Sequence, residues 1–384
     1  MRNIGTVSRG IRAPIIKEGD DLESIVVESI INASKSDNIS LNDRDIVGVT
    51  ESLVARAQGN YVTLDDVAKD IHNKFGDEVG VIFPILSRNR FSLILKGIAR
   101  GVKKLYLQLN YPNDEVGNPI ANIDKIYERG INPYTDEFTE EEYKEIFNSE
   151  DRKNPFTGVD ILEYYKNLSD NIEVIFSNNP ASILKYTKNV LAADIHTRFR
   201  TKELLKRAGA NKVYSLDEIL SQSIDGSGYN QDYGLLGSNY STDETLKLFP
   251  RDGQIFVHNV QKRLLEITGK KIEVMIYGDG AFKDPVAGIW ELADPVVSPA
   301  FTEGLGGVPN ELKLKFLADS SNLSDAEIVE KIRLKNISQK ESLGTTPRKV
   351  TDLVGSLCDL TSGSGDKGTP IILVQGYFDN YANN

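Results

Sequence analysis

Two positively charged side chains and one hydroxyl stand where a chain could hold a phosphate group. Lys17 comes just before an expected helix, and Ser52 and Arg56 come just after an expected short strand. Helix N-termini and the loops that follow buried strands present backbone N–H groups to anions. These residues therefore indicate a phosphate-binding position. The alternative, that Lys17 and Arg56 are ordinary solvated charges, stays open on chemistry alone.

A glycine-rich segment near the end of the chain could serve the same purpose. Residues 363–368 read Gly-Ser-Gly-Asp-Lys-Gly, so Lys367 stands among glycines whose N–H groups can face an anion. The Rossmann motif of similar spacing needs a strand before it and a helix after it, whereas here a helix is expected before and Pro370 follows. A Walker loop is excluded because Thr369 follows Gly368 with no lysine between them. An ordinary turn remains the alternative.

Aspartates beside glycines are the candidate ligands for a divalent metal. Asp279 lies between two glycines just after an expected strand, where loop chemistry is commonly placed. Magnesium and manganese prefer such hard oxygen ligands. Each candidate could instead cap a turn, as Asp often does beside Gly. The weaker candidates are Asp232, Asp284 and Asp366.

A zinc site, a serine hydrolase and a reactive cysteine have less support in the sequence. The three histidines, His72, His196 and His258, are far apart, and no cysteine accompanies them in a zinc-ligand spacing. No Gly-x-Ser-x-Gly motif of a serine hydrolase occurs. Cys358 follows an apolar run and is expected to be a buried, inert thiol. Several basic residues are expected to be solvated helix faces, although one group could hold an anionic substrate: Arg88, Arg90, Arg100, Arg198, Arg200, Lys206 and Arg207.

The elements that position these residues follow from the apolar pattern. A helix from Leu22 to about Ala33 is expected, with Asp20 and Asp21 at its start. A buried strand over 45–50 precedes Ser52. Further strands are expected at 79–86, 105–109, 172–176, 212–214 and 271–277, and an apolar strand is expected after Pro370. Further helices are expected from 63, at 91–102, near 139–148 and 158–168, and at 180–190, 198–208, 216–222, 257–268, 325–335 and 350–360.

Composition limits the class of protein. The chain has 384 residues, 40% of them hydrophobic and 26% charged, which is typical of a globular protein with two or three domains. The net charge of −11 argues against nucleic-acid binding as the main function, because a phosphate backbone needs a basic face. The single cysteine excludes an intramolecular disulfide. Without a signal-peptide pattern or an apolar run near ~20 residues, we expect a cytoplasmic protein.

Three segments resemble one known family. Residues 14–22, Pro-Ile-Ile-Lys-Glu-Gly-Asp-Asp-Leu, with the strand and the segment 52–59 that follow, are similar to the opening of the coenzyme F-420 γ-glutamyl ligases. Residues 227–239 and 361–376 resemble two later elements of that family. Its members use GTP and a divalent metal to join glutamate, through an amide, to a carboxylate of a phospholactyl deazaflavin. The resemblance implies that activity, a GTP or ATP site, Mg or Mn, small-molecule substrates and an intertwined homodimer.

The resemblance also implies site residues. The nucleotide-binding residues would be Pro14, Ile15, Lys17, Ser52, Arg56, Asn239, Gly363, Ser364, Gly365, Asp366, Lys367 and Gly368, with Asp279 and Asp232 on the metal. The chain departs from the family at three places. Leu236 stands where the family has a metal-binding aspartate. The acidic or amide ligand of the family's C-terminal glycine loop falls near Ser364, and the aspartate at the end of its central strand appears one position late, as Asp279. Either the inserted region or a neighbour such as Asp232 supplies the missing ligand, or the metal chemistry is changed or lost.

We therefore expect an α+β protein with mixed sheets. Residues 1–109 and 223–345 would be ligase-like, 110–222 an inserted α/β region, and 346–384 a return that packs the glycine loop on the N-terminal part. The leading hypothesis is a nucleotide- and metal-dependent ligase that adds glutamate to an acceptor carboxylate through an acyl phosphate. The alternative is a non-catalytic nucleotide- or anion-binding protein. An oxidoreductase using the deazaflavin has no residue-level support. The hypothesis requires Lys17, Lys367 and Asn239 to share one anion cavity.

Overall fold

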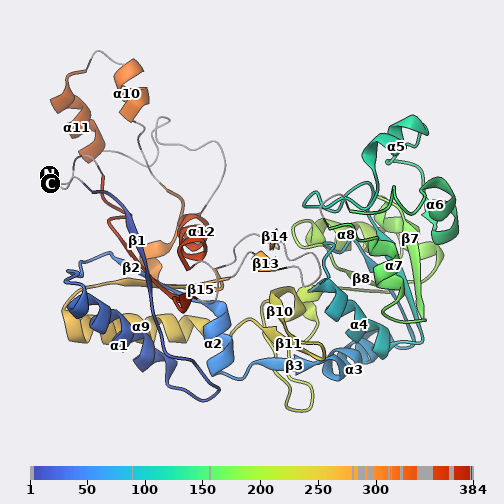
Figure 1. Cartoon of the computed structure of the whole chain (residues 1–384), viewed down its shortest axis with the longest axis horizontal. Coiled ribbons are helices and arrows are strands. Elements are labelled where there is room, and N and C mark those ends of the chain that lie inside the picture. Colours follow the sequence, from blue (N-terminus) through green and yellow to red (C-terminus); the bar gives the residue numbers. More distant parts are fainter. Residues whose placement is uncertain are drawn as a thin grey trace. The chain divides into compact units, whose positions relative to one another are not determined.

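The chain forms two compact units from interleaved segments. The computed structural model describes residues 4–88, 90–154, 157–278, 281–283, 290–292, 298–309, 312, 314–320, 323–334, 349–362, 367–380 and 382. Unit 1 comprises residues 1–58, 252–280 and 294–384, and unit 2 comprises residues 59–251 and 281–293. Both ends of the chain, blue and red in Figure 1, therefore belong to unit 1.

Unit 1 is organised around a five-stranded sheet of order β1-β16-β2-β12-β15. The strands are β1 (Val7–Ile11), β2 (Ile46–Thr50), β12 (Glu273–Tyr277), β15 (Ala300–Phe301) and β16 (Ile371–Gln375). β2 and β12 are parallel, and the other neighbours are antiparallel. Every residue of β2, β12 and β16 is buried. Strands covered on both faces read as continuous apolar runs, which is why the sequence pattern identified these three.

Helices cover both faces of this sheet. One face packs alternate strand residues, such as Val47, Val274 and Leu373, against α1 (Leu22–Ser36) and α9 (Gly253–Thr268). The other face packs Ile46, Met275 and the neighbouring strands against α12 (Val350–Ser362). Successive strand side chains point to opposite faces, so the two clusters use alternate positions. The other helices of unit 1 are α2 (Glu51–Ala57), η4 (Glu303–Leu305), α10 (Leu314–Ser320) and α11 (Asp325–Arg333).

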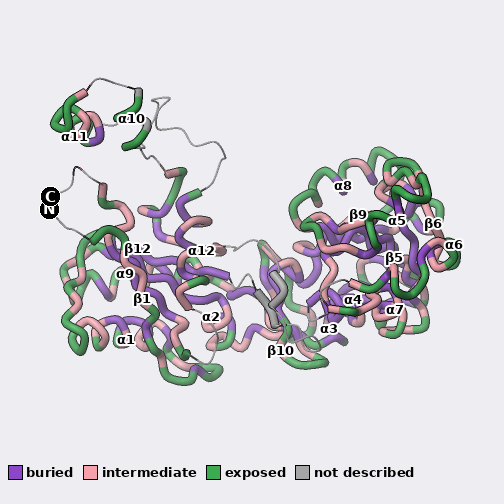
Figure 2. Tube along the Cα trace, turned by 45° about the horizontal axis from the view of Figure 1, so that its top comes forward, coloured by how far each residue is buried: buried purple, intermediate pink, exposed green. Residues whose placement is uncertain are grey.

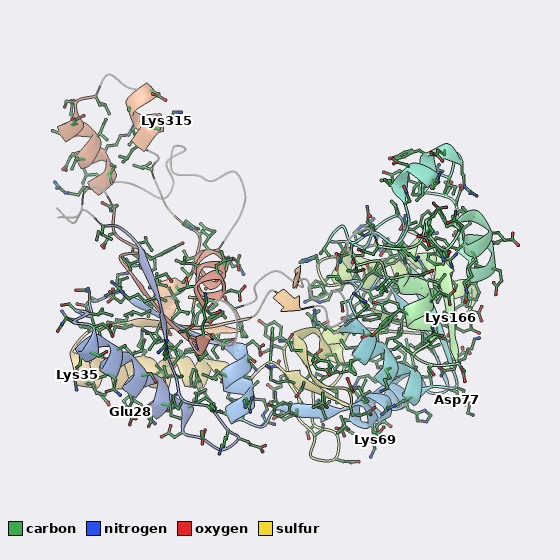
Figure 3. All side chains as sticks on the ribbon, viewed as in Figure 1. Glu28, Lys35, Lys69, Asp77, Lys166 and Lys315 are labelled. Carbon is green, nitrogen blue, oxygen red and sulfur yellow. The ribbon has the colours of Figure 1, made fainter. Side chains whose placement is uncertain are left out.

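The predicted ends of α1 and α9 are confirmed in part. Asp21 caps α1 by accepting a hydrogen bond from the backbone N–H of Ser24 at 3.1 Å, as its position before Leu22 indicated. Glu28 and Lys35 lie on the exposed side of α1 (Figure 3). α9 begins at Gly253 rather than at 257, and it ends at Gly269 in the left-handed conformation that the C-cap position requires.

Unit 2 contains a six-stranded sheet of order β6-β7-β5-β4-β8-β9. Only β6 is antiparallel to its neighbour. The strands are β4 (Glu78–Ile82), β5 (Lys104–Leu109), β6 (Phe138–Thr139), β7 (Ile172–Phe176), β8 (Asn189–Ala192) and β9 (Lys212–Ser215). A second sheet joins β10 (Ser238–Thr242), β11 (Thr245–Leu248) and β3 (Tyr61–Thr63), and β13 (Ala281–Lys283) pairs with β14 (Trp290–Leu292).

The six-stranded sheet of unit 2 also has two covered faces, visible as purple strands inside green surface segments in Figure 2. One face packs against α3 (Leu64–Phe75), α4 (Phe91–Gly101), α5 (Ile123–Glu128), α6 (Glu140–Ile146) and α7 (Ile161–Lys166). The other packs against η1 (Pro180–Lys185) and α8 (Arg198–Arg207). η2 (Leu216–Glu218) and η3 (Gly234–Gly237) complete the unit. The α+β class is confirmed at this level.

Two predictions of helices in unit 2 are wrong. Residues 180–190 form the short η1 and then β8, and residues 216–222 contain only the one-turn η2. The expected strand over 79–86 ends at Ile82, since the apolar run continues into a buried irregular segment. β4 and β5, from before residue 110, pair with β7 and β8 from inside 110–222. The predicted domain boundaries, including the status of 110–222 as an insertion, stay predictions.

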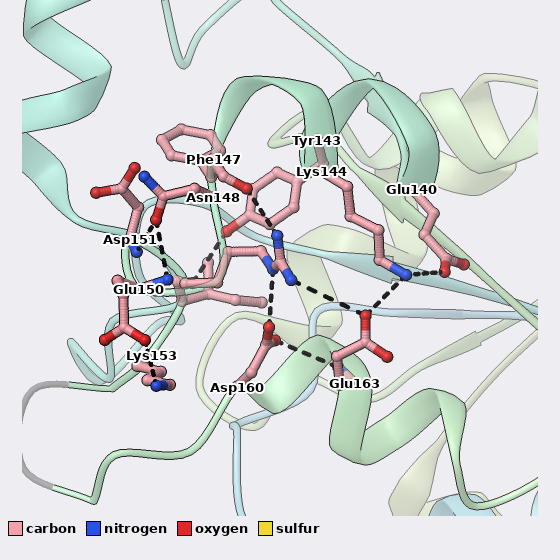
Figure 4. A network of polar contacts seen from close by, with 12 residues as sticks. Glu140, Tyr143, Lys144, Phe147, Asn148, Glu150, Asp151, Lys153, Asp160 and Glu163 are labelled. Carbon is pink, nitrogen blue, oxygen red and sulfur yellow. Dashed lines mark hydrogen bonds and ion pairs between the residues drawn. The ribbon is translucent and has the colours of Figure 1, made fainter.

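The acidic, aromatic stretch 111–170 is fixed by a network of ion pairs (Figure 4). Lys144 bridges Glu140 and Glu163 at 2.8 Å each. Arg152, which is 9% exposed, donates to Asp160 at 2.8 Å and to the carbonyl of Phe147 at 2.7 Å. These acids therefore hold the stretch together. Among the described residues, no helix has both the length and the apolar character needed to cross a membrane.

Candidate functional site

Four segments of unit 1 meet at one end of its five-stranded sheet. β1 ends at Ile11 opposite Ile371, the first residue of β16. β2 ends at Thr50, whose N–H donates to the carbonyl of Pro370 at 3.1 Å. β12 ends at Tyr277, directly beside Thr50. The C-terminal ends of β1, β2 and β12 and the N-terminal end of β16 consequently lie together, although they are up to 360 positions apart in sequence.

Backbone and side-chain contacts hold the two terminal segments against each other. The N–H of Ala13 donates to the carbonyl of Gly368 at 3.1 Å. A Cβ added at Gly10 would lie 2.8 Å from the Cβ of Thr369, so only glycine permits this close approach. Gly368 has φ +64°, a backbone conformation that favours glycine. Pro14 is thus brought next to the Lys367–Thr369 segment.

A cavity of about 1370 Å³ opens beside these segments, between β1 and the C-terminal half of α1. Among the described residues, three positively charged side chains line it, Arg9, Arg12 and Lys367, against one acid, Asp37. The rest of the lining is largely polar and includes Pro14, Ser29, Asn32, Ser36, Asn38, Ser40, Asn42, Thr369 and Gln375. The excess of positive charge and the many hydrogen-bonding groups suit an anionic ligand.

Arg9 is the most firmly held of the three charges. Its Nη1 donates to Gln375 Oε1 at 2.7 Å, and Gln375 Nε2 donates to the buried carboxylate of Asp45 at 2.7 Å. Gln375 Nε2 also donates to the carbonyl of Ser40 at 2.9 Å. Arg12 and Lys367 are exposed at the other end of the cavity. The cavity therefore has one fixed and two more adaptable positive groups.

The other predicted phosphate ligands of unit 1 lie around α2. Ser52 is in its first turn and Arg56 in its last. The N–H of Gly19 donates to the carbonyl of Ala57 at 2.9 Å, so the loop that carries Lys17 rests on the C-terminal end of α2. Ile15 is 84% exposed. Neither Lys17 nor Arg56 lines the large cavity, whereas Pro14 and Lys367 do.

A smaller cavity of about 260 Å³ lies at the starts of α1 and α9 and is acidic. Asp20, Asp21, Glu23 and Asp252 line it. Two of these carboxylates have structural roles: Asp20 accepts from the N–H of Lys17 at 2.7 Å, and Asp21 caps α1. Hydrogen bonds from Ser24 lower the pKa of Asp21. The negative charge of this smaller cavity repels anionic ligands, for which the larger cavity is suited.

Asn239 and Asp232 belong to unit 2. Asn239 lies on β10 opposite Lys247 and is buried. Asp232 is exposed, and its N–H donates to Asn230 Oδ1 at 3.0 Å. Leu236, which stands in place of an expected aspartate, packs against the core of unit 2. The grouping of Asn239 with Lys17 and Lys367 stays a prediction.

The metal site also stays a prediction. Asp279, Asp284, Gly363, Ser364, Gly365 and Asp366 lie outside the described residues. Within the part of the chain that the structure describes, no three His, Cys, Asp or Glu side chains gather as metal ligands. His258 instead faces Glu303 at 2.9 Å. Cys358 is buried, as expected, and burial raises the pKa of its thiol.

Sequence reasoning missed Arg9 and Arg12 as site residues. The segment Val7-Ser8-Arg9-Gly10-Ile11-Arg12 has no regular alternation of polar and apolar residues, so the sequence pattern did not reveal the strand that positions these two arginines. The expectation of solvated helix faces is wrong for Arg88 and Arg90, which are 6% and 8% exposed. Arg100, by contrast, lies in a surface ion-pair cluster with Glu244 and Asp65.

Comparisons with known proteins agree with the resemblance of the three segments. The model of the family described as F420-0:Gamma-glutamyl ligase matches residues 10–376. A coenzyme F420:L-glutamate ligase of Methanosarcina acetivorans is 33% identical over 84 residues, and that of Methanosarcina barkeri is 35% identical over 88 residues. These matches cover 21% and 22% of this chain and 30% and 31% of the relatives, so they span less than a third of each relative's length. The family match extends over nearly the whole chain, and the chain belongs to the F420-0:gamma-glutamyl ligase family.

Proposed function

We propose that the protein is a glutamate ligase that uses a nucleoside triphosphate, GTP or ATP, to form an amide on an acceptor carboxylate. The observation that carries the proposal is the cavity along β1 of unit 1, lined by Arg9, Arg12 and Lys367, in a chain of this family. The substrates of such a reaction are all anionic, and the described residues of the cavity offer three positive groups against one acid.

The reaction balances without an outside oxidant or reductant. An oxygen of the acceptor carboxylate attacks the γ-phosphorus of the triphosphate, and the bond to the nucleoside diphosphate breaks. The amino group of glutamate then attacks the carbonyl carbon of the acyl phosphate, loses a proton, and inorganic phosphate leaves. In both steps negative charge develops on phosphate oxygens, where guanidinium and ammonium groups stabilise it.

The residues present fit the nucleotide better than they fit the metal. Lys367 and the backbone N–H of Gly368, with the hydroxyl of Ser52 in the first turn of α2, would supply the cation, backbone donor and hydroxyl that phosphates require. Pro14 lines the same cavity but has no N–H to donate. Lys17, Ile15, Arg56, Asn239 and residues 363–366 complete the proposed nucleotide set. Magnesium or manganese would neutralise the triphosphate. Since the described residues contain no cluster of ligands, Asp279 and Asp232 stay candidates and no step is assigned to the metal.

A non-catalytic anion-binding protein is the second candidate, and Leu236 favours it. An aliphatic side chain packed against the core of unit 2 cannot ligate a metal as the expected aspartate would. The homodimer and the cytoplasmic location implied by the resemblance are proposals as well.

Calorimetric titration of the whole chain with GTP and with ATP, with and without Mg²⁺ or Mn²⁺, tests the binding. Release of phosphate that depends on glutamate and a deazaflavin acceptor tests the ligase. Lys367→Gln and Arg12→Gln are expected to weaken nucleotide or acceptor binding about tenfold each, because each removes a charge-assisted hydrogen bond. Lys35→Gln, on the exposed side of α1, is the matched control. Tight binding without glutamate-dependent turnover would favour the second candidate.

A further inference from the structure

Gln375 lies beside Arg9 on the face of the unit 1 sheet that borders the large cavity. Ile11 stands two positions after Arg9 in β1 and packs in the cluster with α1 and α9. Leu373 stands two positions before Gln375 in β16 and packs in the same cluster. Alternate side chains of a strand share one face, so Arg9 and Gln375 both lie on the side of α1. Both residues line the cavity there.

The contacts of Gln375 allow only one orientation of its amide group. Nε2 donates to the carbonyl of Ser40 at 2.9 Å and to Asp45 Oδ2 at 2.7 Å. Asp45 Oδ2 also accepts from the N–H of Asn42 at 2.8 Å, so this carboxylate oxygen acts as an acceptor. Two acceptor oxygens can face only the NH₂ end of an amide. The amide oxygen is therefore turned toward Arg9, whose Nη1 donates to it at 2.7 Å.

The contacts that anchor Arg9 are shielded from water. Gln375 is 4% exposed and Asp45 is 2% exposed. Hydrogen bonds in such a low-dielectric environment are stronger than exposed ones, and their partners are costly to leave unsatisfied. Gln375 therefore holds the guanidinium group of Arg9 in one place before a ligand arrives. Preorganisation of a long, flexible side chain lowers the entropic cost of binding.

The amide of Gln375 holds Arg9 without neutralising it. Among the described residues, Arg9 forms no ion pair with a carboxylate, and its guanidinium donates to Gln375 alone. Direct contact with Asp45 would anchor the guanidinium as well, but it would cancel the positive charge beside the cavity. A guanidinium has five N–H donors, so donors remain for a ligand.

We propose that Gln375 is a positioning residue for anion binding in the large cavity. It connects Asp45 to Arg9 through an uncharged amide, so that Arg9 meets the ligand at a fixed position and with its full charge. The group that Arg9 binds is a carboxylate or a phosphate, since a guanidinium fork matches both. The inference rests on the proposed function in one respect, that the cavity holds an anionic substrate, and it assigns no catalytic step to Gln375.

Calorimetric titration of the whole chain in phosphate-free buffer first identifies an anion that contacts Arg9. The probes are GTP and ATP with Mg²⁺, L-glutamate and inorganic pyrophosphate. At least one probe is expected to bind about tenfold more weakly to Arg9→Gln than to wild type, because a charge-assisted hydrogen bond is lost. The inference is overturned if no probe binds to the wild-type chain, or if Arg9→Gln weakens none of them.

Two substitutions of Gln375 then separate position from charge. Gln375→Met keeps the length of the side chain and removes its hydrogen bonds, and it is expected to weaken the probe about three- to tenfold. Gln375→Glu places a carboxylate against Arg9 and is expected to weaken the probe more, because the two charges pair. Gln261→Met is the matched control. Gln261 Nε2 donates to the carbonyl of Ile272 at 2.8 Å and to Glu273 at 3.1 Å, but Gln261 does not line the cavity.

A double-mutant cycle shows whether Gln375 acts through Arg9. In the Arg9→Gln background, Gln375→Met is expected to weaken the probe by less than about twofold further, because the side chain that it positions is absent. An equal loss in both backgrounds, or wild-type affinity in Gln375→Glu, contradicts the inference.

Stability measurements separate this role from a purely structural one. Urea unfolding midpoints of all variants are compared with their affinities, and Gln261→Met is expected to keep wild-type affinity whatever stability it loses. If Gln375→Met does not fold, Gln375→Asn, which keeps the amide on a shorter side chain, replaces it in the cycle. The predicted pattern of binding without glutamate-dependent turnover would contradict the ligase proposal and leave the role of Gln375 intact.

Discussion

A few charged side chains determine which of the two cavities in unit 1 can hold an anion. Arg9 is held through Gln375 to the buried Asp45, which gives the large cavity a fixed positive group. Four carboxylates make the smaller cavity acidic. The two cavities therefore have opposite electrostatic character within one unit. For this reason we propose that the substrates of the ligase bind near Lys367 rather than at the starts of α1 and α9.

The ionisation of one carboxylate, Glu244, makes the stability of the protein depend on pH. Hydrogen bonds from Arg100 and Lys96 lower the pKa of Glu244 to about 2. Because the folded pKa is lower than the unfolded one, the stability that Glu244 contributes is present above pH ~4.5 and is lost as pH falls toward 2. Since the side chain is exposed, the effect is small.

Urea unfolding of wild type and Glu244→Gln at several values of pH checks this. The variant is expected to be slightly less stable than wild type at pH 7, and the difference is expected to shrink as pH is lowered below 4. High salt should reduce the difference at pH 7, because screening weakens exposed ion pairs. A difference that is independent of pH would contradict the assignment of the stabilisation to the ionised carboxylate.

The central strand of unit 1 depends on a glycine. A Cβ added at Gly48 in β2 would lie 2.6 Å from Cys358 Sγ and 3.2 Å from the ring of Tyr277. Gly48→Ala is therefore expected to destabilise the protein by about 1–3 kcal/mol through overpacking. Gly5→Ala is the matched control, because nothing lies within 4 Å of its added Cβ, and its effect should stay within about 0.5 kcal/mol. Equal unfolding midpoints for both variants would show that α12 does not pack on β2 as described.

Capping residues in the sequence predicted where α3 begins and where α9 ends. Thr63 and Asp66 form the capping box expected at the start of α3, and Gly269 ends α9. β8 was missed because a four-residue buried strand has no periodicity to distinguish it from a helix. The apolar run predicts a strand as far as residue 86, but apolar residues alone do not reveal the irregular backbone after Ile82. The burial of this segment comes from tertiary packing.

The order of the strands within each sheet could not be predicted from the sequence pattern. This order depends on pairing between distant segments, so neither the pairing of β1 with β16 nor the position of β4 between β5 and β8 could be derived from local composition. The proximity of Pro14 to Lys367 came from the resemblance. Arg9 and Arg12 became visible as site residues only when the cavity between β1 and α1 was seen.

Unit 1 and unit 2 have separate hydrophobic cores, so a mutation in one core is expected to affect mainly the stability of that unit. The strands of unit 1 pack in two clusters with α1, α9 and α12, and those of unit 2 pack with α3, α4 and α8. Gly48→Ala is therefore expected to speed hydrogen exchange in β2, β12 and β16 and to leave β4 and β5 protected, as expected for distinct cooperative units. Mass-spectrometric exchange on both proteins measures this. Equal acceleration in both sheets would show that the two cores unfold as one.

The central claim is that the positively charged end of unit 1 serves glutamate ligation. The most direct measurement is glutamate-dependent phosphate release from GTP or ATP, in the presence of the deazaflavin acceptor, by wild type, Arg12→Gln and Lys35→Gln. We predict turnover by wild type and Lys35→Gln and a loss of about tenfold or more in kcat/KM for Arg12→Gln. Turnover unaffected by Arg12→Gln, or none by the wild-type chain with either nucleotide, would contradict the claim.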